Sequence, residues 1–308
     1  MRALVTGATG FVGSYLLTHL DRPVILTRDA ARASAQLAGR DVDIRECDIN
    51  AGPPRADAVR GVEAVFHLAG ENVAGGRWTK KKKERIRDSR VRGTRHLVEA
   101  LARLPVAERP RVLVSASAVG YYGPRGDETL TEQSSPGNDF LSDVCAEWER
   151  EAARAGELGV RPVMLRIGIV LGPRGGALQK MLPPFKLGLG GRLGYGRQWM
   201  PWIHVEDLAA LFVHAARTES LRGPVNAVSP QLVRNREFTR ALAKELHRPA
   251  FMPAPYLGLR LLFGEFAQVL FASQKVEPKL AVATGFNYRY AQLDGALHAA
   301  LSSQPGET

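Results

Sequence analysis

The chain has 308 residues, of which 45% are hydrophobic and 24% charged, a composition typical of soluble globular proteins and sufficient for one large domain and a smaller lobe. Its net charge of +11 comes mainly from dispersed arginines, and the one dense basic run, residues 80–83, has no aromatic neighbour except Trp78, so we expect no nucleic-acid partner. The lack of a long uncharged apolar stretch argues against a membrane span, and the two cysteines, Cys47 and Cys145, form no disulfide framework and suggest a cytoplasmic protein.

The first half of the chain alternates short apolar runs with helical patterns, which predicts a parallel sheet covered by helices. Because the first strand begins almost at once, we expect no signal peptide. The predicted strands are Ala3–Val5, Val24–Thr27, Val42–Glu46, Ala64–Leu68, Val112–Ser115 and Val163–Arg166, and the predicted helices are Phe11–Leu20, Val91–Leu104 and Phe140–Ala155. The pattern indicates an α/β fold with a Rossmann-type, doubly wound parallel sheet.

After Gly172 the alternation of apolar runs and helical patterns ends. Residues 172–200 are rich in glycine and poor in long apolar runs, which is typical of loops over a substrate site. Further helices are predicted over Glu237–Leu246 and Leu257–Phe271. We therefore expect a Rossmann domain over residues 1–171, to which residues 200–216 return, and a smaller C-terminal substrate lobe with a terminal module over residues 172–308.

A glycine loop with the sequence GATGFVG, residues 7–13, follows the first strand and opens the first helix. Gly7 permits the tight turn, Gly10 lets backbone amides approach a pyrophosphate, and Gly13 allows the helix to pack closely on the strand. The N-terminus of that helix then turns its partial positive charge toward the phosphates. We prefer this interpretation, a dinucleotide site, to a tight turn that binds nothing.

The end of the second strand indicates which dinucleotide is bound. An NAD site usually has an acidic side chain there for the ribose 2′-hydroxyl, whereas this chain has Thr27 and Arg28. A guanidinium can hold a 2′-phosphate through charge-assisted hydrogen bonds, so we favour NADP(H), although Asp29 follows at once. Asp48, after the third strand, has two open interpretations: it accepts a hydrogen bond from the adenine amino group, or it caps its own loop.

Longer runs of sequence carry a resemblance that covers essentially the whole chain. They include LAGEN at 68–72, SRVRGT at 89–94, SASAVGYYG at 115–123, TEQSSPGNDFLSDVCAEWE at 131–149, RIGIVLGPRGGAL at 166–178, PFKLGLGGRLGYGRQWMPWIHVEDL at 184–208 and GEFAQVLFASQKVEP at 264–278. In these runs the chain resembles the extended short-chain dehydrogenase/reductase superfamily, in its branch of nucleoside-diphosphate-sugar epimerases. Within that branch it is most similar to a divergent subgroup of epimerase family proteins with a small C-terminal module.

The resemblance implies which residues contact the cofactor. A side chain larger than those of Ala69 and Gly70 would clash with the bound nucleotide. Glu71 has two open interpretations: it lies in the cofactor cleft, or it is an acidic residue of a surface loop. Together with Asp48, the expected cofactor-binding residues are Gly7, Thr9, Gly10, Phe11, Val12, Gly13, Thr27, Arg28, Leu68, Ala69, Gly70, Glu71, Arg90 and Val170.

The superfamily's catalytic pattern is incomplete in this chain. Relatives carry a tyrosine and, four residues later, a lysine that lowers the pKa of the phenol. No tyrosine here has a lysine at that spacing, and aligning the helix on Trp148 places Leu141 and Cys145 at the two positions. The usual asparagine aligns with Arg90, and only the serine remains, as Ser117. The usual proton relay therefore cannot operate, because a neutral tyrosine is a poor base at neutral pH.

Three residues are candidates for catalytic work in its place. Ser117 is expected to hydrogen-bond a substrate oxygen, and Tyr121 or His204 to transfer the proton. Tyr121 and Tyr122 follow Ser117 on the same loop, whereas His204 lies in a run that borders the site in relatives and equally suits a bond to a loop carbonyl. Cys145 is expected to pack rather than to act as a nucleophile.

Contacts with a substrate are expected from Gln198, Trp199 and Trp202, and no spacing of residues indicates a metal site. The sequence therefore favours an NADP(H)-binding oxidoreductase or epimerase-like protein acting on an unidentified small molecule, with a nucleotide-sugar as the family-level substrate. The main alternative is an NADPH-binding sensor or regulatory protein without turnover. By analogy to relatives, we expect a homodimer through the helices at 91–104 and 140–155.

Overall fold

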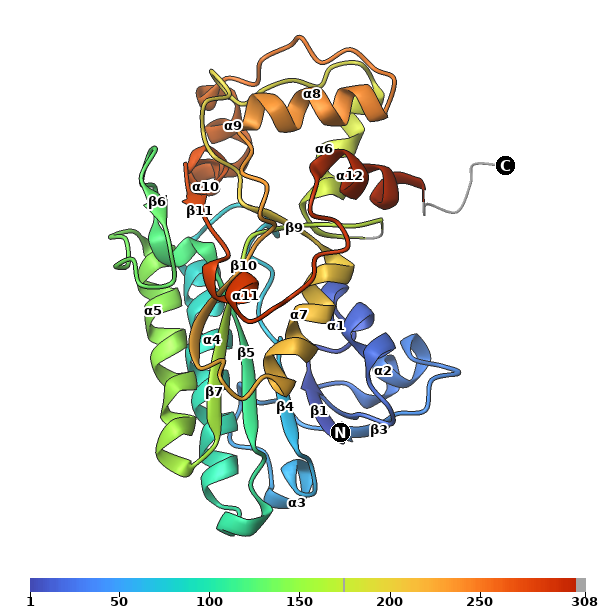
Figure 1. Ribbon diagram of the computed structural model, residues 1–308, viewed down its shortest axis with the longest axis vertical. Helices are drawn as coiled ribbons and strands as arrows, with labels where there is room; N and C mark the ends of the chain where they lie inside the picture. Colours follow the sequence, from blue (N-terminus) through green and yellow to red (C-terminus); the bar gives the residue numbers. More distant parts are fainter. Residues whose placement is uncertain (174, 303–308) are drawn as a thin grey trace.

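The structure is a computed structural model that describes residues 1–173 and 175–302. Its centre is a seven-stranded sheet in which every pairing is parallel and the strand order is β10-β7-β5-β4-β1-β2-β3 (Figure 1). The strands are β1 (Ala3–Thr6), β2 (Val24–Thr27), β3 (Asp43–Glu46), β4 (Ala64–His67), β5 (Val112–Ala118), β7 (Arg161–Ile167) and β10 (Gly223–Ala227). The strand order reverses between β1 and β4, the place where sheets of this type bind ligands beyond their carboxyl ends.

Helices cover both faces of the sheet, which explains why its central strands are continuous apolar runs. One face packs against α1 (Phe11–Leu16), α2 (Ala30–Gln36) and α7 (Val205–Arg217). The other packs against α3 (Ala56–Val59), α4 (Lys80–Ala102) and α5 (Phe140–Ala153). Short 3₁₀ segments extend or join these elements at Leu17–His19, Val106–Glu108, Val119–Tyr122 and Arg154–Leu158.

The smaller lobe, at the top of Figure 1, has a core of its own around Trp202 and Phe238. Its elements are α6 (Gly176–Lys186), α8 (Asn235–Glu245), α9 (Tyr256–Phe263), α10 (Ala267–Phe271) and α12 (Leu293–Ser302), with a 3₁₀ turn at Gly264–Phe266. Two small parallel pairs, β8 (Ile169–Leu171) with β9 (Trp202–His204) and β6 (Thr129–Leu130) with β11 (Lys275–Val276), connect the lobe to the sheet, and α11 (Lys279–Ala283) packs near β10.

The α/β class and the doubly wound parallel sheet are confirmed, and all six predicted strands are present. The helix predicted over Leu257–Phe271 is wrong as a single helix, because Gly264 at φ +63° ends α9 and a new turn begins there. The helix predicted over Phe11–Leu20 narrows to a 3₁₀ turn after Leu16. The lobe boundary at residue 171 stays a prediction, and the sheet draws its edge strand β10 from beyond it.

Candidate functional site

The glycine loop lies between β1 and α1, at the carboxyl edge of the sheet. Gly7 has φ +74°, and a Cβ there would lie 2.7 Å from the carbonyl carbon of Leu68. A Cβ on Gly13 would lie 2.3 Å from the carbonyl oxygen of Gly7. Gly10 is the N-cap of α1 and provides no side-chain cap, so the first amides of this helix are free of side-chain acceptors. A glycine cradle at an uncapped helix N-terminus suits the pyrophosphate of a dinucleotide.

Buried polar side chains hold the neighbouring loop after β4 in place. Thr6 Oγ1 accepts from the amide of Ala69 at 3.2 Å and lies 2.7 Å from His67 Nδ1, while His67 Nε2 lies 2.9 Å from Thr94 Oγ1. Burial lowers the pKa of His67 to about 4, so the ring is neutral near pH 7. This chain of polar contacts, which the sequence did not indicate, fixes the small residues 69–70 relative to the glycine loop.

Phe11 and Val170, predicted from widely separated runs, meet at the start of α1. A Cβ on Gly175 would lie 2.6 Å from the Phe11 ring, and one on Gly176 would lie 2.6 Å from the Val170 carbonyl oxygen. Gly175 and Gly176 therefore lie directly against Phe11, and glycine is needed for that close approach. Thr9 and Val12 lie in the same turn, Thr9 exposed and Val12 half-buried.

Arg28 follows β2 and is exposed, as a residue that receives a ligand phosphate should be. In residues 1–173 and 175–302 it forms no ion pair, although its charge helps to lower the pKa of Glu71. Asp29 does not neutralise it, because that carboxylate caps α2 by accepting from the amide of Arg32 at 2.9 Å. Thr27 Oγ1 accepts from the Asp29 amide at 3.3 Å and so orders the same turn.

Glu71 lies in a cluster of positive charge at the same edge. Lys82 Nζ donates to Glu71 Oε1 at 2.6 Å, and Arg85 Nε lies 3.7 Å from the same oxygen. These bonds, with the charges of Lys82, Arg85 and Arg28, hold the pKa of Glu71 below its usual value. Lys82 belongs to the dense basic run at residues 80–83, yet its side chain is only 6% exposed. The pair leaves Arg28 as the cluster's unpaired cation within the described residues.

Arg90 projects from α4 toward Gly70, and the contact with the cofactor that the resemblance implies stays a prediction. Its Nη1 donates to the carbonyl oxygens of Glu71 at 3.0 Å and Ile86 at 3.2 Å, and its guanidinium lies 5.2 Å from the centre of the Trp148 ring. A Cβ on Gly70 would lie 3.3 Å from its Cζ, so glycine is needed for this packing. Burial lowers the pKa of Arg90, and its bonds to two carbonyl oxygens fix the guanidinium beside Gly70.

For Asp48 the sequence left two roles open, capping of its own loop and contact with the adenine amino group, and the structure shows the first. Its Oδ1 accepts from the amide of Asn50 at 3.0 Å, so the side chain caps its own loop. The contact with an adenine amino group stays a prediction, which the second carboxylate oxygen could serve.

Ser117 is placed differently from the expectation. It is 3% exposed, and its hydroxyl donates to Glu149 Oε1 at 2.6 Å. Glu149 also accepts from Arg166 Nε and Nη2, both at 2.8 Å. The single proton of Ser117 is therefore engaged by a buried carboxylate rather than free for a substrate oxygen.

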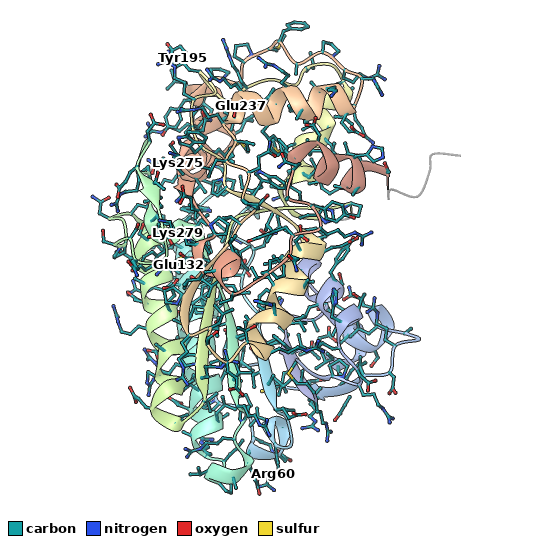
Figure 2. All side chains as sticks on the ribbon, viewed as in Figure 1. Arg60, Glu132, Tyr195, Glu237, Lys275 and Lys279 are labelled. Carbon is teal, nitrogen blue, oxygen red and sulfur yellow. The ribbon has the colours of Figure 1, made fainter. Side chains whose placement is uncertain are left out.

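Arg166 links this pair to the two tyrosines. Its Nη1 donates to the hydroxyl oxygen of Tyr122 at 3.0 Å, and its Cζ lies 3.5 Å from the centre of the Tyr121 ring. Tyr122 donates to Asn226 Oδ1 at 2.6 Å, and burial raises its pKa to about 12. Glu132, labelled in Figure 2, accepts from the amide of Asn226 at 3.2 Å. The sequence missed this network, although an arginine inside an apolar strand could have signalled a buried partner.

The tyrosines therefore differ in what they can do. Tyr122 is buried and fully engaged, whereas Tyr121 is half-buried and its hydroxyl makes no hydrogen bond within the described part of the chain. Tyr121 keeps a hydroxyl that can exchange a proton with a ligand.

His204 does not fit the predicted role in proton transfer. It is 1% exposed, its Nδ1 accepts from the amide of Glu206 at 3.3 Å as the N-cap of α7, and its ring lies 4.0 Å from that of Tyr290. Burial lowers its pKa to about 4, so it stays neutral and capping near pH 7. Trp202 is also wrong as a substrate contact, because it is fully buried in the core of the smaller lobe.

The remaining candidates agree better with their surroundings. Cys145 is buried under the turn at Gly120, where burial raises its pKa to about 12, so it packs and is not a nucleophile. Gln198 is 9% exposed and donates to the carbonyl oxygen of Leu193 at 3.3 Å. Trp199 donates to Asp127 at 2.7 Å under the guanidinium of Arg234. Substrate contact by Gln198 and Trp199 stays a prediction.

Among residues 1–173 and 175–302, no three His, Cys, Asp or Glu side chains lie close enough to hold a metal ion. None of the described helices combines the length and the apolar character needed to cross a membrane.

Comparison with protein-family models gives two matches along the chain. The model of the NAD dependent epimerase/dehydratase family matches residues 3–227, and that of a domain of unknown function matches residues 254–300. The Arabidopsis thaliana protein named epimerase family protein SDR39U1 homolog, chloroplastic, is 39% identical over 97% of this chain and 86% of its own. Epimerase family protein YfhF of Bacillus subtilis is 35% identical over 96% of this chain and 97% of its own.

Solved structures give a consistent result. Human epimerase family protein SDR39U1, isoform 2, crystallised with NADPH, has a TM-score of 0.86 and 33% identity, covering 98% of this chain and 100% of that one. UDP-glucuronic acid 4-epimerase from Bacillus cereus, in complex with UDP-glucuronic acid and NAD, has a TM-score of 0.78 over 97% of this chain and 98% of that one. At 17% identity the second likeness shows the fold alone.

Proposed function

Because this chain belongs to the NAD-dependent epimerase/dehydratase family, we propose that it binds NADP(H) at the glycine loop and acts as an oxidoreductase or epimerase-like enzyme on a small molecule. The observation that carries the proposal is the N-terminus of α1, which has no side-chain cap and follows a loop that admits only glycine at positions 7 and 13. Arg28, directly after the neighbouring strand β2, forms no ion pair within the described residues. The human relative crystallised with NADPH supports the same cofactor.

Each part of the cradle has a distinct task in this proposal. The amides at the start of α1 bind the pyrophosphate, and Arg28 binds the 2′-phosphate that distinguishes NADP(H) from NAD(H). Gly70 and the fixed guanidinium of Arg90 shape the wall of the cleft. The bound nicotinamide would supply hydride transfer, and the protein would supply orientation and a proton. Of the three predicted catalytic residues, only Tyr121 keeps an uncommitted hydroxyl in the described structure.

The test of cofactor choice is titration of the protein with NADPH and with NADH, followed by fluorescence. We expect wild type to prefer NADPH, and Arg28→Ala to lose about tenfold to a hundredfold of that preference, the usual effect of removing a hydrogen bond to a charged group. Arg32→Ala is the matched control, because Arg32 is an exposed arginine one turn away on α2. An unchanged preference in Arg28→Ala would refute the role given to Arg28.

A second candidate function is an NADPH-binding sensor or regulatory protein without turnover. The observation in its favour is that Ser117 is engaged by Glu149 while Leu141 and Cys145 occupy the usual tyrosine and lysine positions. Absorbance of the nicotinamide band should be followed while carbonyl compounds and nucleotide-sugars, the first substrate class to test, are screened. Tight NADPH binding with no turnover of any compound would favour the sensor.

We propose a cytoplasmic location, supported by the two cysteines, which are both free. The plant relative named chloroplastic shows that family members work in other compartments as well. We also propose a homodimer through α4 and α5, to be tested by sedimentation of the purified protein.

A further inference from the structure

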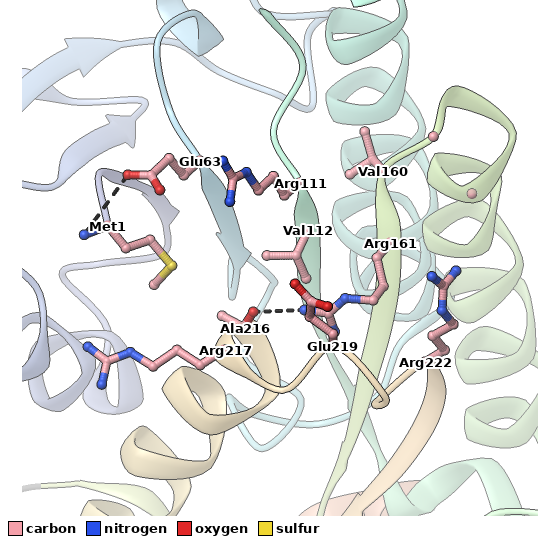
Figure 3. Close-up of a pocket in the computed structure, with 12 residues that line it drawn as sticks. Met1, Glu63, Arg111, Val112, Val160, Arg161, Ala216, Arg217, Glu219 and Arg222 are labelled. Atoms are coloured by element: carbon pink, nitrogen blue, oxygen red, sulfur yellow. Dashed lines mark hydrogen bonds and ion pairs between the residues drawn. The ribbon is translucent and has the colours of Figure 1, made fainter. Parts of the chain in front are cut away.

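Arginines gather at the edge of the sheet opposite to the glycine loop. Arg111 directly precedes β5, Arg161 is the first residue of β7, and Arg222 directly precedes β10. These strands are neighbours and run parallel, so their amino ends meet at one place. Arg217, the last residue of α7, also lines this region, and Figure 3 shows its side chain extending away from those of Arg161 and Arg222. The topology thus concentrates arginines that are dispersed in the sequence.

The arginines line a cavity rather than a flat surface. Its volume is about 470 Å³, within the range of small-molecule sites. Three buried apolar side chains, Val112, Val160 and Ala216, line the cavity, and Glu63 and Glu219 complete the wall (Figure 3). A ligand here would therefore meet apolar surface and positive charge together.

One of the arginines is fixed by the protein itself. Arg161 donates to the carbonyl oxygens of Ala215 at 3.0 Å, Ala216 at 2.7 Å and Leu221 at 2.6 Å, at the end of α7. Burial and the nearby charge of Arg222 lower its pKa. Arg161 thus shapes the cavity and adds a fixed positive charge, and it is not free to change partner.

The other three guanidinium groups lack partners. Within residues 1–173 and 175–302, Arg111, Arg217 and Arg222 form no ion pair and no side-chain hydrogen bond. Glu63 is already engaged, since it accepts from the amide of Arg2 at 2.9 Å. The cavity therefore has more positive charge than its own carboxylates balance.

We propose that this cavity binds a small organic phosphate, with the phosphate on Arg111 and Arg222 and the organic part on the apolar wall. Guanidinium forks that approach from separate elements suit the several oxygens of one phosphate group, and the limited volume suits one small molecule. The site is separate from the cofactor cleft, because the glycine loop lies at the carboxyl ends of the parallel strands and the cavity at their amino ends. The proposal is independent of the proposed function.

The test uses phenyl phosphate and the full chain in isothermal titration calorimetry, with phenol and inorganic phosphate as partial ligands. We expect phenyl phosphate to bind more tightly than either, and Arg111→Ala and Arg222→Ala each to weaken binding by about tenfold, as removal of a charge-assisted contact does. Arg103→Ala, which changes an exposed arginine at the C-cap of α4, should bind as wild type does. Circular dichroism of each variant checks that the fold is kept.

Three results would overturn the proposal. The first is no measurable binding of phenyl phosphate to wild type. The second is equal binding by wild type, Arg111→Ala and Arg222→Ala, which would leave these arginines only the role of balancing the negative ends of nearby helices. The third is loss of binding in Arg28→Ala, which would place the phosphate in the cofactor cleft instead.

Discussion

Replacing Arg166 by methionine should destabilise the protein strongly, because it isolates a buried charge. The side chain of Arg166 is 3% exposed and that of Glu149 is 9% exposed, and the guanidinium donates to both carboxylate oxygens at 2.8 Å. Without it, Glu149 keeps, among residues 1–173 and 175–302, only the hydroxyl of Ser117 as a side-chain donor. Breaking one partner of a buried pair costs about 3–5 kcal/mol. With an unfolding entropy of about 2.1 cal/mol/K per residue, this corresponds to a fall in Tm of about 5–8 °C.

The assay is thermal unfolding followed by circular dichroism, with two further variants. Arg166→Met combined with Glu149→Gln removes the unpaired charge, so the double variant should be more stable than Arg166→Met alone. Arg87→Met breaks an exposed ion pair between Arg87 of α4 and Glu147 of α5. This control should lower the free energy of unfolding by less than about 1 kcal/mol. If Arg166→Met lowers the Tm by less than about 2 °C and the double variant shows no recovery, Arg166 and Glu149 do not act as a buried ion pair.

Three further changes test the cofactor cleft and its surroundings. Gly13→Ala should abolish tight NADPH binding in fluorescence titration, because the new Cβ would lie 2.3 Å from a backbone oxygen, whereas Gly295→Ala on α12, with nothing within 4 Å, should bind normally. Lys82→Met frees the Glu71 carboxylate to neutralise Arg28, so the preference for NADPH over NADH should fall, and equal preferences in wild type and variant would contradict this. Ser117→Ala should lower the free energy of unfolding by about 1–3 kcal/mol and leave NADPH affinity unchanged; a loss of affinity would assign the hydroxyl to the cofactor instead.

Much of the fold could be predicted because parallel strands buried on both faces leave a local signal. β4 and β5 each begin with three apolar residues, and turn residues bound the two strands. β10 was missed because it begins with glycine and proline, and its extended form depends on pairing with β7. The first half of α4 was missed because it is a run of charged residues, which the Thr79 cap allows to begin at Lys80.

The glycine loop and Arg28 could be proposed from the sequence because their expected roles depend on local backbone and single side chains, and those roles stay predictions. The placement of Ser117 depends on residues far apart in the chain. Ser117 and Arg166 are opposite each other in the pairing of β5 with β7, and Glu149 reaches both from α5. The spacing of residues in the sequence carries no information about these contacts. From the sequence, Ser117 is therefore assigned the substrate-binding role that the family resemblance suggests.

In the proposed site, cofactor binding does not depend on the residues at the catalytic positions. The proposed cradle for the dinucleotide consists of backbone amides, glycines and Arg28. The carboxylate of Glu149 holds the one expected catalytic residue that the sequence retained, and Arg166 in turn is fixed 3.5 Å from the centre of the Tyr121 ring. If the protein is the proposed enzyme, we expect the proton that accompanies hydride transfer to come from Tyr121, from the substrate or from water. A sensor without turnover needs no proton source. A measurement of turnover, and not of cofactor affinity, therefore discriminates between the two proposed functions.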